Sequence, residues 1–71
     1  MQLVSLGVTR RDLLKHLQDN GCQLLREGGE HSIYWRPAGG QSASVPRHNE
    51  IARFTARRIC DVQEIPRPKG P

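Results

Sequence analysis

The chain is organised around residues 26–36, which read REGGEHSIYWR. The glycine pair at 28–29 can adopt backbone conformations that other residues avoid, which predicts a tight hairpin turn. Aromatic and β-branched residues predict a strand over residues 30–36, and a first strand is predicted over residues 22–27. His31 then lies at the start of a strand beside flexible backbone and a carboxylate, a setting suited to proton transfer by an imidazole at neutral pH.

A first helix is predicted before this hairpin. Thr9 supplies an N-cap hydroxyl, and Asn20-Gly21 supplies a left-handed stop. One face of this helix is apolar and carries Leu13, Leu14 and Leu17. His16 lies on the flank of the helix, and we expect it to be inert.

After the hairpin, small polar and apolar residues alternate over residues 41–45, which predicts a third strand. Pairing should stop at Pro46, because proline has no N–H to donate to a sheet. We predict an N-cap for the second helix at Thr55, with Phe54 and Ile59 forming a hydrophobic staple. Residues 49–53 would form a turn or a short helical lead-in. Pro66 ends the helical region.

The order helix, strand, strand, strand, helix predicts an α+β fold of two layers, a three-stranded antiparallel sheet with both helices on one face. Double-stranded-RNA-binding domains share this order and dock on the shape and phosphates of RNA. We expect one domain over residues 1–66 and a flexible tail over 67–71. In the lead before the first helix, the apolar residues Leu3, Val4 and Leu6 are candidates to pack against the core.

Composition limits the possible partners and cofactors. Eleven lysines and arginines against seven acidic residues give a net charge of +4, which favours polyanions or an acidic protein as a partner. The sequence has neither a signal segment nor a run of about 20 apolar residues, so we expect a cytoplasmic protein away from membranes. Cys22 and Cys60 lack metal-ligand spacing, so we interpret them as free core thiols and expect no metal or other cofactor.

Paired arginines stand near both proposed helix starts, Arg10-Arg11 and Arg57-Arg58. The positive end of a helix dipole disfavours a nearby cation by about 0.3–1 kcal/mol. The same end attracts phosphate, and arginine adds bidentate donors beside it. The pattern is therefore open to two interpretations, an anion-binding site or a solvated basic surface.

Three motifs in this order resemble the HicA (YcfA-like) family of bacterial toxins: GEHSIY at 29–34, VPRH at 45–48 and TARRI at 55–59. The similarity extends from Arg11 to Pro66. It implies a fold like that of double-stranded-RNA-binding domains, cleavage of mRNA, and neutralisation by a HicB-type antitoxin. The catalytic histidine of the family, in its Gly-Ser-His signature, corresponds to His31. Glu30 stands here in place of the serine.

Cleavage of RNA without a metal needs a base for the 2′-hydroxyl, an acid for the leaving 5′-oxygen and cations for the phosphate. We assign proton transfer to His31. The residues expected to bind RNA are Arg10, Arg11, Arg36, Arg47, His48, Arg57 and Arg58. His48 is also open to interpretation as the complementary acid or as a structural residue.

Tyr34 and Trp35 point to opposite faces of one strand, so one packs in the core and the other can stack on a base. The alternative to a nuclease is a non-catalytic RNA-binding module in which His31 is incidental. The oligomeric state stays open, because the uncovered face of the sheet is equally suited to solvent, RNA or a second copy.

Overall fold

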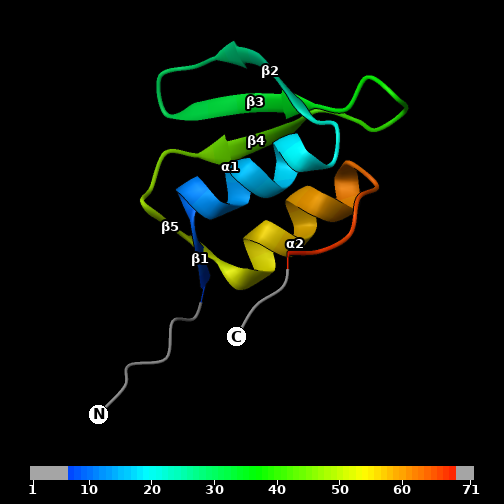
Figure 1. Cartoon of the computed structure of the whole chain (residues 1–71). Coiled ribbons are helices and arrows are strands. Elements are labelled where there is room, and N and C mark those ends of the chain that lie inside the picture. The colour runs from blue at the N-terminus through cyan, green and yellow to red at the C-terminus, as the bar shows by residue number, and fades with distance from the viewer. Residues whose placement is uncertain (1–6, 69–71) are drawn as a thin grey trace.

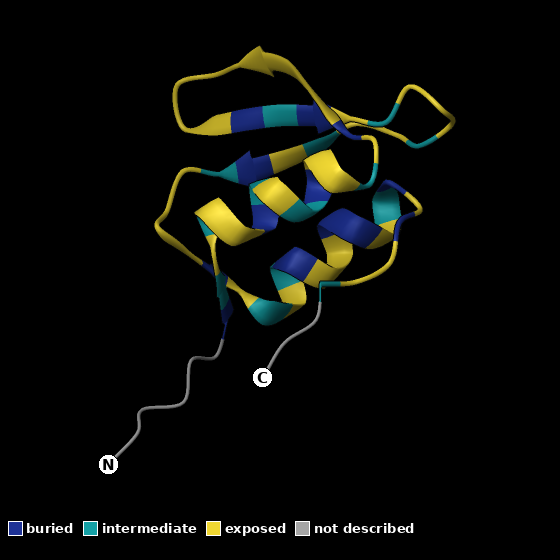
Figure 2. Cartoon of the chain, viewed as in Figure 1, coloured by how far each residue is buried: buried dark blue, intermediate teal, exposed yellow. Residues whose placement is uncertain are grey.

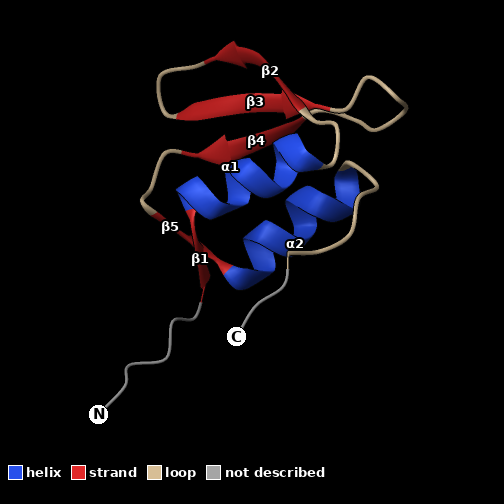
Figure 3. Cartoon of the chain, viewed as in Figure 1, coloured by secondary structure: helices blue, strands red, loops and turns tan. Residues whose placement is uncertain are grey.

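The computed structural model describes residues 7–68, which form two helices and five strands (Figure 1). In chain order they are β1 (Gly7–Thr9), α1 (Arg10–Asp19), β2 (Gln23–Glu27), β3 (His31–Trp35), β4 (Ala43–Pro46), β5 (Glu50–Ala52) and α2 (Arg53–Val62). Strands β2, β3 and β4 form an antiparallel sheet in that order, and both helices lie on the same side of it (Figure 3). The predicted α+β class and the three-stranded antiparallel sheet are confirmed.

A second, two-stranded sheet was not predicted. β1 pairs antiparallel with β5, so that Val8 lies opposite Ile51. A side chain at Gly7 is sterically excluded, because its Cβ would lie only 2.0 Å from the carbonyl oxygen of Ile51. The turn or helical lead-in expected over residues 49–53 is therefore wrong, since Glu50–Ala52 is a strand. The expected packing of Leu3, Val4 and Leu6 lies outside the described residues.

Helix α1 follows the prediction. The Thr9 hydroxyl accepts a hydrogen bond from the Asp12 backbone N–H at 3.1 Å. The helix ends at a C-cap on Asn20, and Gly21 has the left-handed φ of 87°. Leu13 and Leu17 are fully buried, so the apolar face predicted for this helix supplies part of the core.

Helix α2 begins three residues earlier than predicted. Its N-cap is Ala52, and no side chain caps the helix, because β5 leads directly into its first turn. Phe54 is 70% exposed, so the predicted hydrophobic staple with Ile59 is wrong. As a consequence, Arg57 and Arg58 lie in the second turn of α2 and not at its N-terminus.

The core lies between the helices and one face of the sheet. Figure 2 shows the buried segments of α1, α2, β3 and β4 facing one another, whereas β2 is exposed along its whole length. The buried apolar residues are Leu13, Leu17, Cys22, Tyr34, Val45, Ile51, Ala56, Ile59, Cys60 and Ile65. Neither helix of residues 7–68 has the length and apolar character needed to cross a membrane.

The segment after α2 ties both helices to the rest of the fold. Gln63 is fully buried and donates from Nε2 to the Tyr34 carbonyl oxygen at 2.9 Å. His16 donates from Nε2 to the Pro66 carbonyl oxygen at 2.6 Å, and Arg67 makes two hydrogen bonds to the Asp61 carboxylate. His16 therefore has a structural contact. The last three residues, 69–71, lie outside the described part of the chain.

Cys22 and Cys60 are free and buried, which confirms their interpretation as core thiols. Burial raises the pKa of Cys22, and burial together with the neighbouring Cys22 thiol raises the pKa of Cys60 to about 11. In an unfolded chain a cysteine ionises near its ordinary value of 9.0. The unfolded state therefore loses its thiol protons at a lower pH than the folded state does.

We expect this difference to destabilise the fold in alkaline solution. The thiol contribution is constant below pH 9.0 and is lost as the pH rises toward about 11, because only the unfolded chain ionises in that window. Urea unfolding at about pH 8 and about pH 10 measures the change in the free energy of unfolding. Cys60→Ala is the comparison, because it removes this thiol and should reduce the pH dependence. An identical pH dependence in both proteins contradicts the assignment.

Candidate active site at the start of β3

His31 opens β3 on the face of the sheet that carries no helix. It is exposed and pairs across the sheet with Pro46 of β4. Alternation along the strand places Ser32 and Tyr34 on the helix side, where both are buried. The imidazole is therefore accessible to a substrate, and it stands at one end of the sheet.

The predicted hairpin turn before His31 forms, but it does not use the left-handed backbone that glycine allows. The Gly28 N–H donates to the His31 carbonyl oxygen at 2.7 Å and closes the hairpin. Neither Gly28 nor Gly29 takes a left-handed φ; in the described chain the glycines that do are Gly21 and Gly39. Glu30, in the same turn, is exposed.

A buried hydroxyl lies on the opposite side of the sheet from His31, one residue along the strand. Ser32 is fully buried, and its Oγ accepts a hydrogen bond from Arg10 Nη2 at 2.7 Å. The same hydroxyl donates to Glu27 Oε1 at 2.8 Å. Arg10 also donates from Nε to the Pro46 carbonyl oxygen at 2.9 Å. These contacts join α1, β2, β3 and β4 at the end of the sheet where His31 lies.

Arg47 completes this arrangement from the end of β4. Its Nη2 donates to Glu27 Oε1 and, at 2.9 Å, to the Gly28 carbonyl oxygen. The guanidinium therefore holds the end of β2 and the hairpin turn in place. We call Arg10, Glu27, Ser32 and Arg47 the Ser32 network. Two of the predicted RNA-binding residues, Arg10 and Arg47, belong to it and have fixed positions near His31.

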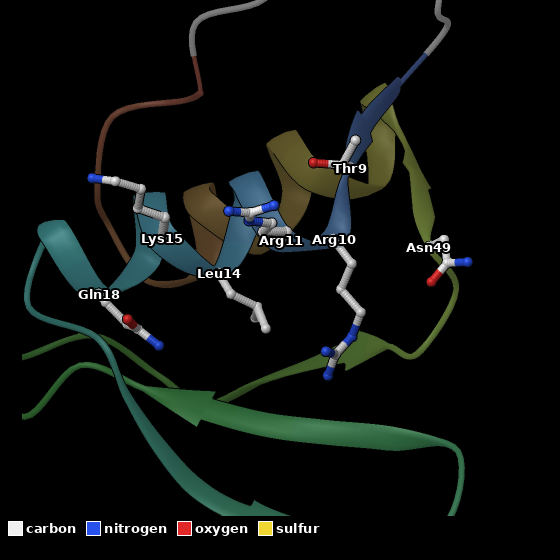
Figure 4. A pocket seen from close by; sticks show the side chains of 7 residues that line it. All are labelled: Thr9, Arg10, Arg11, Leu14, Lys15, Gln18 and Asn49. Carbon is white, nitrogen blue, oxygen red and sulfur yellow. The ribbon is translucent and has the colours of Figure 1, made fainter.

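A basic groove runs along α1 near the same end of the sheet. It has a volume of about 590 Å³ and is lined by Thr9, Arg10, Arg11, Leu14, Lys15, Gln18 and Asn49 (Figure 4). Figure 4 shows Arg10 and Leu14 pointing from the helix toward the strands. Three of the lining residues are basic and none is acidic, although Lys15 also pairs with Asp19 at 2.8 Å. The groove is therefore suited to an anion.

The other predicted RNA-binding residues do not gather at His31. Arg36 follows the opposite end of β3, about 16 Å along the strand, and donates from Nε to the Gln63 carbonyl oxygen at 2.6 Å. Arg57 and Arg58 are exposed on α2, where Arg58 lines a second groove beside the start of β4. His48 is exposed in the connection from β4 to β5, two residues beyond the cross-strand partner of His31.

Tyr34 and Trp35, the two neighbouring aromatics of β3, point to opposite faces of the sheet, as expected. Tyr34 is 6% exposed and packs in the core, whereas Trp35 is 36% exposed on the open face.

Sequence reasoning missed Glu27 and Ser32. The alternation that buries Tyr34 also buries Ser32, and a buried hydroxyl needs hydrogen-bond partners, so the pattern did contain a signal. Across residues 7–68, no group of three or more His, Cys, Asp or Glu side chains is arranged to hold a metal ion.

Fold and site together define a small α+β protein with an exposed histidine on the open face of its sheet and a basic groove along α1. A family model described as the HicA toxin of bacterial toxin–antitoxin systems matches residues 10–65 of the 71-residue chain. The chain therefore belongs to the HicA toxin family, as its motifs predicted, and acts as a toxin with an antitoxin partner. Comparisons with curated proteins and with solved structures gave no significant match.

The Ser32 network makes a specific prediction about stability. Ser32→Ala removes the hydroxyl that Arg10 and Glu27 share, and the loss of hydrogen bonds to charged groups should lower the free energy of unfolding by about 1–3 kcal/mol. Ser44→Ala is the matched control, an exposed serine on the neighbouring strand, and should change it by less than about 0.5 kcal/mol. Urea denaturation measures both. Equal effects of the two substitutions would show that the network does not stabilise the fold.

Proposed function

We propose that this chain is a metal-independent endoribonuclease toxin that cleaves mRNA, with His31 as the residue that transfers the proton. The observation that supports the proposal most strongly is the accessible imidazole at the end of the sheet, in a chain of the HicA family. An imidazole can act as base or acid near neutral pH. The Ser32 network fixes the strand from which it projects.

The reaction follows from the chemistry of RNA itself. The 2′-oxygen attacks the adjacent phosphorus as its proton is removed, and the bond from phosphorus to the 5′-oxygen breaks. The leaving 5′-oxygen gains a proton, so the products are a 2′,3′-cyclic phosphate and a 5′-hydroxyl. His31 would supply one of the two proton transfers, each of which is worth about 10²–10⁴-fold in rate.

Negative charge on the phosphate requires cations nearby. Arg47, at the rim beside His31, is the best placed of the predicted RNA-binding arginines. Arg11 lines the groove along α1, on the helix side of the sheet. Arg36 is largely engaged with the end of α2, where its side chain is 19% exposed. Arg57 and Arg58 would meet RNA only at a distance from His31, along the second helix.

The antitoxin partner would be a HicB-type protein. The chain carries a net charge of +4, and the groove along α1 has basic and no acidic residues in its lining. A partner that presents carboxylates to this groove while covering His31 would exclude RNA from both. The same electrostatic complementarity would accelerate association between the two proteins.

The central test of the proposal is removal of the imidazole. His31→Ala should lower kcat for cleavage of single-stranded RNA by about 100-fold or more while RNA binding persists, because proton transfer is lost and the other side chains that contact RNA are retained. Cleavage by the unmodified protein should continue with a chelator present, and a 2′-deoxy substitution at the cut site should prevent it. Gel analysis of end-labelled RNA measures these rates.

His48→Ala is the comparison, since His48 is the other exposed histidine of residues 7–68. We expect it to raise KM and leave kcat nearly unchanged. If the unmodified protein and His31→Ala both bind RNA and both fail to cleave it, the chain is a non-catalytic RNA-binding module and the nuclease proposal is wrong.

A further inference from the structure

The open face of the sheet carries one continuous row of side chains along β3. His31, Ile33 and Trp35 alternate with the buried residues of the strand and so share this face. The register adds their cross-strand neighbours, because residues directly opposite one another in an antiparallel sheet point to the same side. These neighbours are Gln23 and Arg26 of β2 and Ser44 and Pro46 of β4.

This face combines an exposed aromatic ring with basic side chains. Its seven side chains include an aromatic ring, an arginine and the candidate catalytic histidine, and none is a carboxylate. Trp35 is 36% exposed although it belongs to the central strand of the sheet, and both helices lie on the other side. The bases of unpaired nucleic acid stack on exposed aromatic rings, and a basic side chain on the same face, here Arg26 opposite Ile33, can neutralise a phosphate.

We propose that Trp35 is a base-stacking platform and that the substrate is single-stranded RNA lying along β3 from His31 to Trp35. This inference rests on the proposed function, because it places the substrate of the His31 site. Stacking requires the flat face of a base to be uncovered, and a base inside a duplex is covered on both faces by its neighbours. The platform therefore selects unpaired RNA.

The spacing along the strand sets a minimum length for the substrate. Trp35 lies four residues from His31, which corresponds to about 13 Å along an antiparallel strand. Successive bases of a stacked strand are about 3.4 Å apart, so the base on Trp35 is not the immediate neighbour of the phosphodiester at His31. A dinucleotide that reaches His31 would not also reach Trp35.

A fluorescence titration tests the platform directly, because Trp35 is the only tryptophan in the chain. We would titrate the full-length His31→Ala protein, which does not consume the RNA, with a single-stranded RNA of about ten nucleotides. Stacking predicts that tryptophan emission is quenched, and that a duplex of the same sequence quenches it much less. Binding that is visible by anisotropy of labelled RNA but leaves the emission unchanged would overturn the proposal.

Substitution of Trp35 supplies the second measurement. Trp35→Ala should weaken the binding of the ten-nucleotide RNA about 5- to 150-fold, the equivalent of about 1–3 kcal/mol for one stacked base. It should leave dinucleotide cleavage unchanged, and Trp35→Tyr should restore part of the loss. Phe54→Ala is the matched control, because Phe54 is an exposed aromatic on α2, and it should have no effect. Equal losses on both substrates, or none on either, would contradict the platform.

The outcomes separate this inference from the proposed function. If cleavage depends on His31 but RNA neither quenches tryptophan emission nor binds more weakly to Trp35→Ala, the nuclease proposal stands and the platform is wrong. Quenching by single-stranded RNA without any cleavage supports the platform and overturns the nuclease. If Trp35→Ala leaves RNA binding intact but abolishes binding of the antitoxin, the face belongs to the protein partner and the platform is wrong.

Discussion

Two hydrogen bonds at the Ser32 hydroxyl hold together the segments on which the site depends. Through Arg10 they connect the start of α1 to β3, and through Glu27 they connect β3 to the end of β2. Because Ser32 is fully buried, its hydroxyl depends on these protein partners, and losing either is costly. His31 is the neighbouring residue on the same strand and points the other way. The contacts that order the inner face of the sheet therefore also fix the backbone from which the imidazole projects.

The far end of β3 is anchored in a different manner. The Tyr34 carbonyl accepts a hydrogen bond from the buried Gln63 side chain, and Arg36 donates to the Gln63 carbonyl. The central strand is thus held at one end by α1 and at the other by the end of α2. The inner face of β3 packs in the core, and its outer face is accessible to ligands. The same division gives Arg36, which we predicted to bind RNA, a structural contact at this end of the strand.

Local signals predicted the elements whose causes are local. Thr9 caps α1 and Gly21 follows its end, as their positions in the sequence indicated, and the alternation around Tyr34 gave the correct faces of β3. The pairing of Gly7–Thr9 with Glu50–Ala52 joins two three-residue segments that are far apart in the chain, and neither has a pattern that marks a strand. Since β5 sets where α2 begins, the N-cap predicted at Thr55 and the staple at Phe54 failed for the same reason.

The site was predictable to a similar extent. The motif around His31 located the exposed histidine, and the one-sided alternation left Trp35 or Tyr34 as the outward aromatic. The directions of the arginine side chains were not predictable, because a long guanidinium side chain takes its position from tertiary contacts. Arg10 and Arg47 lie near His31, and both are engaged with Ser32 or Glu27, which sequence reasoning had not singled out.

The central claim is that RNA approaches the uncovered face of the sheet and meets the imidazole of His31 there. NMR spectra of the histidine ring protons, recorded while a 2′-O-methyl RNA that cannot be cleaved is added, test it most directly. The account predicts that the His31 signals move with RNA concentration, while those of His16, which donates to the Pro66 carbonyl oxygen, stay in place. Saturable RNA binding that leaves the His31 signals unchanged would contradict it.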